Sequence, residues 1–241
     1  MPHGRPDWYN ITPMVQVHAS EDLAELSARQ DHINVYDRRG NVVHVETFAQ
    51  GTGGFYTYVT GAASSALSAA YSRTDGLALC CYTYGSTDDV VTLIWTQGIQ
   101  AALSRGLEVS WSATAQHGII ELGLGHDEGG SPWLGGIRYS YETTTLYYYD
   151  SSNNLIVIDA TLVLPTDATV WHFCKIAVDF EEHQYLRVLV DNHSYSLAGI
   201  GLSSSLWSIP GVDYWIVSAQ GGGAVASEYY IDSVIATINE L

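Results

Sequence analysis

Three acidic segments contain the residues best suited to binding a metal ion. They are "STDD" at 86–89, "GHDEGG" at 125–130 and "DSSNN" at 150–154. Calcium takes about six to eight oxygen ligands, which loops of this composition supply. Asp127, Glu128 and Asp150 are therefore the candidate ligands, and calcium is the candidate cofactor. Because Asp, Asn, Ser and Gly are also the usual β-turn residues and no fixed calcium motif is present, ordinary turns are the favoured alternative.

Tyrosines are the second group with binding chemistry, and the chain has 17 of them beside 7 tryptophans. Alternate positions on a strand share one face, where a phenol ring offers a flat apolar body and a hydrogen-bonding tip. Sugars or another protein could use such a surface. The predicted carbohydrate-binding residues are three alternating pairs: Tyr82 and Tyr84, Tyr139 and Tyr141, and Tyr147 and Tyr149. Packing of the rings in the core or across strands is the alternative, and it is favoured for any single pair.

Charge and composition exclude several classes of protein. Nine Lys and Arg against 26 Asp and Glu give a net charge of −17, which repels a nucleic-acid backbone. The N-terminal "MPHGRPDWYN" lacks the apolar region of a signal peptide, and no apolar run is long enough to span a bilayer. We therefore expect neither nucleic acid nor a membrane as partner. The nine histidines have no zinc-binding spacing, and Cys80, Cys81 and Cys174 are expected to be reduced thiols.

The chain divides into three segments of different amino-acid composition, which position these residues. Residues 1–17 contain half of the prolines around Trp8 and Tyr9, and predict an extended arm in which Trp8, Tyr9 and Pro13 would grip a neighbouring molecule. Residues 18–40 begin with "SEDLAELSARQ", which predicts one short helix and a linker. Residues 41–241 form the predicted β domain.

Short β-branched and aromatic runs between turn residues predict the strands of this domain. They lie at 41–48, 55–60, 66–72, 77–84, 90–96, 107–115, 118–125, 136–141, 144–149, 155–159, 170–180, 185–191, 194–197, 212–219 and 227–238. A single open sheet rarely exceeds about ten strands, so this number predicts two packed sheets. The fold class is all-β, an antiparallel two-sheet sandwich.

Residues 171–199, "WHFCKIAVDFEEHQYLRVLVDNHSYSLAG", predict a meander with turns at 182–184 and 192–193. This register pairs, on a core face, Phe180 with Leu186, Val178 with Val188 and Ile176 with Val190. On the opposite face it pairs Asp179 with Arg187 and Lys175 with Asp191. We expect that second face to be solvated.

The same stretch resembles the strand, acidic turn and strand of concanavalin A-like or laminin G-like jelly-roll domains, a superfamily of lectins and glucanases. "SEYYIDSVIATI" is similar to their last strand, and "HVETFAQGTGGF" to their opening strand and loop. The resemblance covers about residues 41–241 and implies a jelly-roll fold. A weaker resemblance connects the chain with phage decoration and tail proteins built on such jelly rolls.

Glycosidases with this jelly roll carry Glu-x-Asp-x-(x)-Glu on one strand, which places their acids in one cleft. "GIIELGLGHDEGG" supplies Glu121, but the positions in phase with it are Ile119, Gly123 and Gly125. The catalytic pattern is therefore absent, and we expect no enzyme activity. Glycoside hydrolysis through Glu121 is the least favoured alternative.

Two functions remain as hypotheses. The first is a non-catalytic structural module of an assembly, such as a decoration protein of a virus or phage particle, with protein neighbours and a homo-oligomeric state. This hypothesis predicts a location on the virion surface or in a cytoplasmic assembly. The second is a lectin-like carbohydrate-binding module that uses the tyrosines and calcium.

Overall fold

The structure is a computed structural model that describes residues 40–49, 51–73, 76–99, 103–127, 132–204, 211–223 and 225–240. The predicted arm with Trp8, Tyr9 and Pro13 lies outside these residues, as do the predicted helix and linker apart from Gly40. Glu128, one of the predicted metal ligands, also lies outside them.

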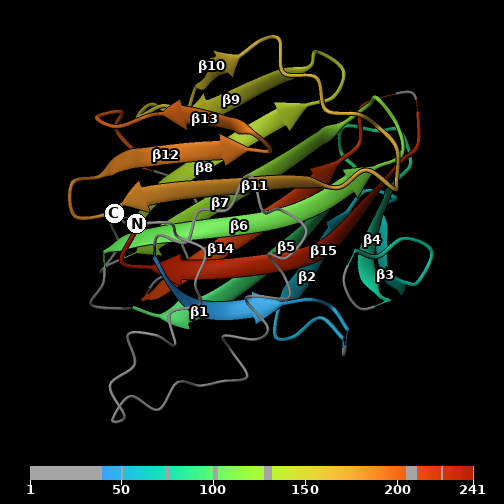
Figure 1. The fold of residues 1–241 in the computed structure, drawn as a ribbon, viewed down its shortest axis with the longest axis horizontal. Helices are drawn as coiled ribbons and strands as arrows, with labels where there is room; N and C mark the ends of the chain where they lie inside the picture. The colour runs from blue at the N-terminus through green and yellow to red at the C-terminus, as the bar shows by residue number, and fades with distance from the viewer. Residues whose placement is uncertain are drawn as a thin grey trace.

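Two antiparallel sheets face each other across one core (Figure 1). Sheet A contains β1 (Asn41–Glu46), β3 (Ser64–Ser68), β4 (Ala78–Thr83), β6 (Ser104–Ala113), β11 (His172–Asp179), β12 (Gln184–Val190), β13 (His193–Ser196) and β15 (Ser227–Ile238). Its strand order is β13-β12-β11-β6-β15-β4-β3, and β1 also pairs with β15. Each predicted strand overlaps an observed one, which confirms the two-sheet sandwich.

Sheet B lies behind sheet A in Figure 1. It contains β2 (Tyr56–Thr60), β5 (Val90–Gly98), β7 (Ile119–Asp127), β8 (Pro132–Ser140), β9 (Thr145–Tyr149), β10 (Leu155–Asp159) and β14 (Val212–Gln220). The strand order is β10-β9-β8-β7-β14-β5-β2. The outer face of sheet B therefore points away from the viewer of Figure 1.

The core lies between the sheets because alternate strand residues are apolar. Leu107, Val109 and Trp111 of β6 are buried, as are Leu122 of β7 and Trp215 of β14. The indole N–H of Trp215 donates a hydrogen bond to the carbonyl of Gly106 at 3.0 Å. The indole N–H of Trp111 donates to the hydroxyl of Tyr141 at 2.8 Å. The large aromatic rings are thus buried without leaving their polar atoms unsatisfied.

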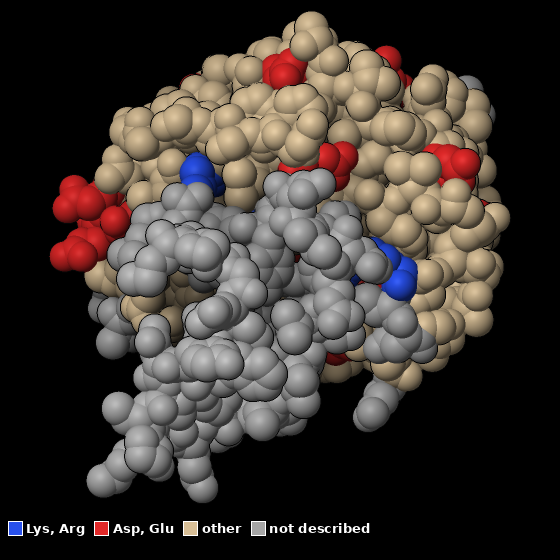
Figure 2. Space-filling view, viewed as in Figure 1, with Lys and Arg blue, Asp and Glu red and all other residues tan. Residues whose placement is uncertain are grey.

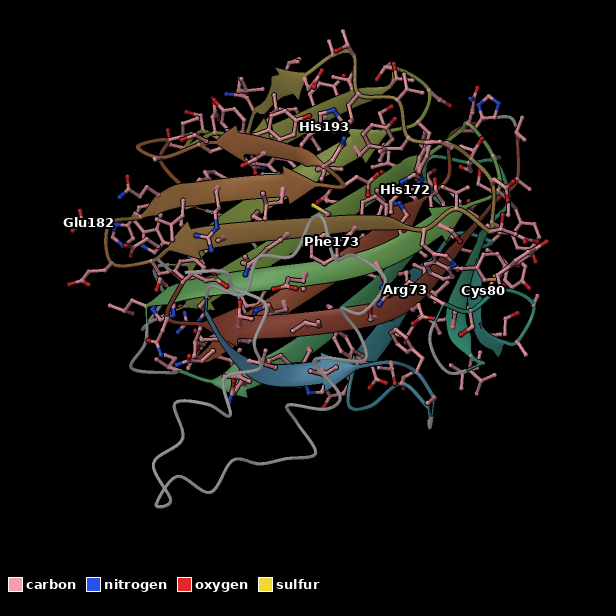
Figure 3. All side chains as sticks on the ribbon, viewed as in Figure 1. Arg73, Cys80, His172, Phe173, Glu182 and His193 are labelled. Atoms are coloured by element: carbon pink, nitrogen blue, oxygen red, sulfur yellow. The ribbon has the colours of Figure 1, made fainter. Side chains whose placement is uncertain are left out.

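The predicted register of the β11–β12 hairpin is wrong. Ile176 pairs with Val188, and a bulge at Leu186 makes Val178 the partner of Tyr185. The chain turns through residues 180–183. The Asp179 carboxylate accepts hydrogen bonds from the backbone N–H groups of Glu181 and Glu182, at 2.9 and 3.2 Å. Glu182 lies at the tip of this turn (Figure 3). The turn is thus one residue longer than expected and begins two residues earlier, and the bulge then changes the register by one residue.

The core assignment of this hairpin is nevertheless confirmed for most of its residues. Buried in the structure are Ile176, Val178, Phe180, Val188 and Val190. Leu186 is only partly buried because it occupies the bulge. The second turn also differs from the prediction: Val190 pairs with His193, so the loop is Asp191-Asn192, and Asp191 adopts a left-handed φ of 48°.

The prediction that the opposite face of this hairpin is solvated is also wrong. Lys175 has no exposed surface and Arg187 is 6% exposed. Lys175 Nζ lies 3.1 Å from Glu108 Oε1 and 2.9 Å from Glu240 Oε1. Arg187 forms an ion pair with Glu240 Oε2, and the Thr237 hydroxyl donates a hydrogen bond to Glu240 Oε1. We call Glu108, Lys175, Arg187 and Glu240 the sheet A charge network.

This network lies on the face of sheet A that Figures 2 and 3 present to the viewer. On the described part of this face, acidic side chains form several separate patches and basic ones are few (Figure 2). A Cβ atom at Gly106 would come within 2.6 Å of Glu240 Oε1. Glycine at this position therefore leaves the space that the Glu240 carboxylate occupies.

Two smaller expectations concern the cysteines and a membrane. Cys80, Cys81 and Cys174 are free and buried, and burial raises the pKa of the Cys174 thiol. Within the described ranges, the chain has no helix of the length and apolarity that crossing a membrane requires.

Candidate functional site

The outer face of sheet B contains a cleft of about 560 Å³. The described residues that line it are Thr92, Glu121, Leu134, Tyr149, Ser151, Ser152, Asn153, Ser203, Ser204, Ile216 and Ser218. Their strand neighbours Leu93, Leu122 and Val217 point into the core. The same alternation that builds the core therefore places these side chains on the opposite face.

Strand register aligns a row of side chains across the cleft. From β2 to β9 the row is Tyr58, Thr92, Ser218, Glu121, Arg138 and Tyr147. Ser218 Oγ donates a hydrogen bond to Thr92 Oγ1 at 3.0 Å. The row begins and ends with tyrosine and has hydroxyl and charged groups in its middle.

Three glycines lie beside this row; Gly123 is next to the lining residues Leu134 and Ile216, whereas the Tyr214 ring lies over Gly125. Gly123 and Gly125 of β7 and Gly136 of β8 are buried on the outer face. A Cβ atom at Gly136 would lie 3.0 Å from the ring of Tyr149. The absence of a side chain therefore lets that ring lie against the backbone, with Glu121 beside it. Gly123 leaves the floor flat between Leu134 and Ile216.

Glu121 is the centre of a polar cluster in the cleft. Its Oε2 accepts hydrogen bonds from Arg138 Nε at 2.8 Å and from the Tyr149 hydroxyl at 2.9 Å, and Arg138 Nη2 lies 2.7 Å away. The Arg138 guanidinium also lies 5.7 Å from the centre of the Tyr149 ring. Among the described residues, no group bonds the second oxygen, Oε1, and the Glu121 side chain is 29% exposed.

The Tyr149 hydroxyl is held in its protonated form. Burial raises its pKa above the ordinary value, and the nearby Glu121 carboxylate raises it further. A phenol in this state donates its proton to Glu121 and cannot act as a base near neutral pH. The cluster therefore presents one open carboxylate oxygen, supported from behind by three donor groups.

Serine and asparagine side chains form the end wall of the cleft. Ser151, Ser152 and Asn153 belong to the turn between β9 and β10, and Ser203 is held to Leu134 by two backbone hydrogen bonds of 2.8 and 3.0 Å. Asp150 fixes the turn, because its carboxylate accepts hydrogen bonds from the backbone N–H groups of Ser152 and Asn154, at 2.9 and 2.8 Å. These bonds lower the pKa of Asp150. The wall thus presents hydroxyl and amide groups on a hydrogen-bonded frame.

Only one of the three predicted tyrosine pairs lies at this cleft. Tyr147 and Tyr149 are on its face and partly buried. Tyr139 and Tyr141 are 3% and 2% exposed, with ring centres 4.8 Å apart, so the surface role predicted for them is wrong. They occupy inward positions of β8 and the turn after it, as the core alternative proposed.

Tyr82 and Tyr84 lie at sheet A, away from the cleft. Tyr82 packs against a small buried cluster that includes Cys80 and Tyr230. Tyr84 follows the end of β4 and is 61% exposed. The two side chains therefore do not form one strand face, and their predicted binding role has no support from the cleft.

Two exposed tyrosines were missed by the sequence prediction. Tyr56 and Tyr58 of β2 are 71% and 59% exposed and flank the cleft face beside Ile94 and Thr92. Their alternation in "YTYVT" is the same signal that identified the other pairs. Thr92 and Ser218 were also missed, because isolated hydroxyl residues on strands have no distinctive spacing.

The predicted metal ligands do not form a recognisable centre. Asp127 is buried at the end of β7, whereas Asp150 is exposed and bonded to its own turn. Within the described ranges, no group of three His, Cys, Asp or Glu residues could hold a metal ion. Asp150 thus has the ordinary turn role that was the alternative to calcium binding.

Comparison with known proteins identifies the fold. No family model matches the sequence, and no curated protein is significantly similar to it. A sialidase structure is similar with a TM-score of 0.54 and 12% identity, covering 83% of this chain but only 19% of the sialidase chain. A carbohydrate esterase from the Shiga toxin-encoding bacteriophage phi24B has a TM-score of 0.58 and 14% identity, covering 83% of this chain and 100% of the esterase chain.

An endo-β-1,4-glucuronan lyase from the fungus Trichoderma reesei is similar at a TM-score of 0.55 and 10% identity, covering 82% of this chain and 96% of the lyase chain. At such low identity these likenesses concern the fold alone. Together with the sheet order, they show the fold of the chain as a two-sheet antiparallel jelly-roll β-sandwich.

Proposed function

We propose that this chain is a non-catalytic carbohydrate-binding module whose ligand occupies the cleft on sheet B. The observation that carries the proposal is a cleft of about 560 Å³ lined by the Tyr149 ring and Glu121 with its open oxygen, beside the flat strand surface at Gly123. Sugar rings have apolar faces and hydroxyl rims. A flat floor with an aromatic ring suits the faces, and the hydroxyl, amide and carboxylate groups suit the rims.

The names of the structural neighbours support a carbohydrate ligand. A sialidase, a carbohydrate esterase and a glucuronan lyase all share this fold. Because fold alone does not determine function, the proposal rests on the cleft and takes only support from these names.

The acids of the cleft favour binding over hydrolysis. Most glycosidases use a pair of carboxyl groups, about 5–5.5 Å apart in retaining enzymes and about 6.5–9.5 Å apart in inverting ones. Among the described lining residues, Glu121 is the only acid. Gly123 and Gly125 occupy the next two positions of β7 on the same face. The Glu121 carboxylate can accept hydrogen bonds from a sugar, but the described residues that line the cleft give it no partner acid for hydrolysis.

A glycan array with and without a chelator tests the proposal, followed by calorimetry with the best ligand. We expect Tyr149→Ala to weaken binding at least tenfold. Tyr84→Ala removes a more exposed tyrosine ring at the other sheet, 61% exposed, and should leave binding unchanged. A chelator that abolishes binding would restore calcium as a cofactor. Failure of the wild-type chain to bind any glycan would contradict the proposed function.

A second proposal places the module in an assembly, such as a virus or phage particle. The specific support is the likeness to a bacteriophage protein over the whole length of that chain, together with the proline-rich and aromatic sequence of residues 1–17. In this proposal Trp8, Tyr9 and Pro13 contact a neighbouring protein, in a homo-oligomer or a particle. Deleting residues 1–17 should reduce the mass measured by light scattering, and an unchanged mass would overturn the arm's role.

A further inference from the structure

We infer that the cleft selects uncharged glycans over anionic ones and that Glu121 sets this preference. The inference rests on the proposed carbohydrate-binding function and names its ligand class. It concerns the difference in affinity between a neutral sugar chain and an acidic chain of the same linkage and length.

The distribution of charge in the cleft is the first argument. Glu121 is the only described lining residue with a formal charge, and the others offer hydroxyl, amide, phenol or apolar groups. An acidic glycan would need a cation at its carboxylate or sulfate, and the described lining provides none. It would instead meet the open Oε1 of Glu121, which carries like charge.

The position of Arg138 is the second argument. Its Nε and Nη2 both contact Glu121 Oε2, at 2.8 and 2.7 Å, so its charge is already compensated by that carboxylate. The paired guanidinium supports the carboxylate and leaves Oε1 to accept hydrogen bonds from sugar hydroxyls. A neutral ligand therefore uses the arrangement as it stands, whereas an anion would have to displace Glu121.

The charge of the whole chain acts in the same direction. With a net charge of −17, the protein repels anionic polymers at low ionic strength. Salt screens this long-range part over about 8 Å at physiological ionic strength, but it screens the contact with Glu121 much less. The preference for neutral glycans should therefore weaken with added salt without disappearing.

Glu121→Gln tests the role of this residue because it changes charge with little change of shape. The amide oxygen still accepts a hydrogen bond from Arg138, but the guanidinium charge is no longer compensated. We expect affinity for acidic oligosaccharides to rise about tenfold and affinity for neutral ones to fall a few-fold. Glu182→Gln is the matched control, because it changes the net charge equally at an exposed turn of sheet A (Figure 3).

The experiment measures binding of oligosaccharide pairs that differ only in glucose versus glucuronic acid, at low and at physiological salt. The expected result is that wild type binds a neutral member more tightly than its acidic partner in both salts, and that Glu121→Gln narrows or reverses this ratio while Glu182→Gln does not. Tighter wild-type binding of the acidic member would overturn the inference and leave the proposed function intact. If Glu121→Gln and Glu182→Gln have equal ratios of neutral to acidic affinity, the role of Glu121 is overturned.

Two outcomes separate the inference from the function on which it rests. If wild type binds neither member of any pair, nor any glycan of the array, the proposed function fails and the inference with it. If Glu121→Gln does not fold, as judged by its thermal melt, the selectivity is still decided by the wild-type chain. The deciding quantity is its ratio of affinities for the neutral and the acidic member at low and at physiological salt. Arg138→Gln then decides the role of the ion pair, because it should increase discrimination against the acidic member.

Discussion

The outer faces of the two sheets each carry a glutamate paired with cations, but in opposite environments. On sheet A, Glu240 is 3% exposed and is held by Lys175 and Arg187. On sheet B, Glu121 is paired with Arg138, yet its side chain is 29% exposed and one oxygen is open. The buried network is closed to a ligand by its burial, whereas the cleft pair is accessible. Burial, rather than residue type, distinguishes the stabilising cluster from the candidate binding one.

The largest expected effect on the free energy of unfolding comes from removing a cation. We compare its removal from the buried sheet A charge network with its removal from the Glu121–Arg138 pair. Lys175→Met leaves Glu108 and Glu240 buried with one cation fewer, which should lower the free energy of unfolding by about 3–5 kcal/mol. Arg138→Met breaks a partly exposed pair and should lower it by no more than about 1 kcal/mol. Urea denaturation measures both. Equal losses would show that the two faces do not differ as described.

Two glycines on β7 provide the next comparison. A Cβ atom at Gly125 would lie 1.8 Å from the ring of Tyr214, whereas one at Gly123 would meet only ordinary contacts of 3.6 and 3.7 Å. Gly125→Ala should therefore lower the free energy of unfolding by about 3 kcal/mol through overpacking. Gly123→Ala should be nearly neutral for stability and should reduce glycan affinity by filling the floor. If both variants are equally stable, the packing of Tyr214 over Gly125 is wrong.

Tyr214 itself makes stability dependent on alkaline pH. Burial, and then the Asp127 carboxylate, raise its pKa to about 12, while an unfolded tyrosine ionises near about 10. The contribution of Tyr214 to the free energy of unfolding, on the order of 2 kcal/mol, is thus fully present below pH about 10 and is lost as the pH rises towards 12. Unfolding free energies measured across this range should decline. The decline should be less steep in Tyr214→Phe, and an identical slope would contradict the assignment.

The smallest expected effect concerns the hydroxyl of Tyr149. Tyr149→Phe keeps the ring over Gly136 but removes the hydrogen bond to Glu121. Because this bond is partly exposed, stability should fall by only about 1 kcal/mol or less. Glycan affinity should fall less than in Tyr149→Ala, since the ring remains. Calorimetry compares the two variants, and a larger loss in Tyr149→Phe would mean that the ring is not the binding surface.

Much of the fold could be predicted because strand alternation is a local signal. The positions of the strands follow from it, including 155–159 and 227–238, whose bounds agree with β10 and β15. The hairpin register could not be predicted, because neither the bulge at Leu186 nor the left-handed φ of His183, 51°, has a sequence signature in this stretch.

Long-range contacts explain the remaining errors. Lys175, the only lysine of the chain, was expected in solvent because of its charge, but its partners Glu108 and Glu240 come from distant segments. Of the residues at the cleft, only Tyr147, Tyr149 and, as the least favoured catalytic candidate, Glu121 were identified from the sequence. Its other groups come from strands that are neighbours in sheet B but not in sequence, so the sheet order was needed to assemble them.

The most direct test of the central claim is an NMR map of where the glycan selected by the array binds. The account predicts that backbone amide shifts concentrate at Glu121, Gly123, Tyr149 and Ser218 on the outer face of sheet B. It also predicts that amides of the sheet A charge network do not shift. Shifts that concentrate on sheet A, or that are absent from the cleft while binding is measurable, would contradict the account.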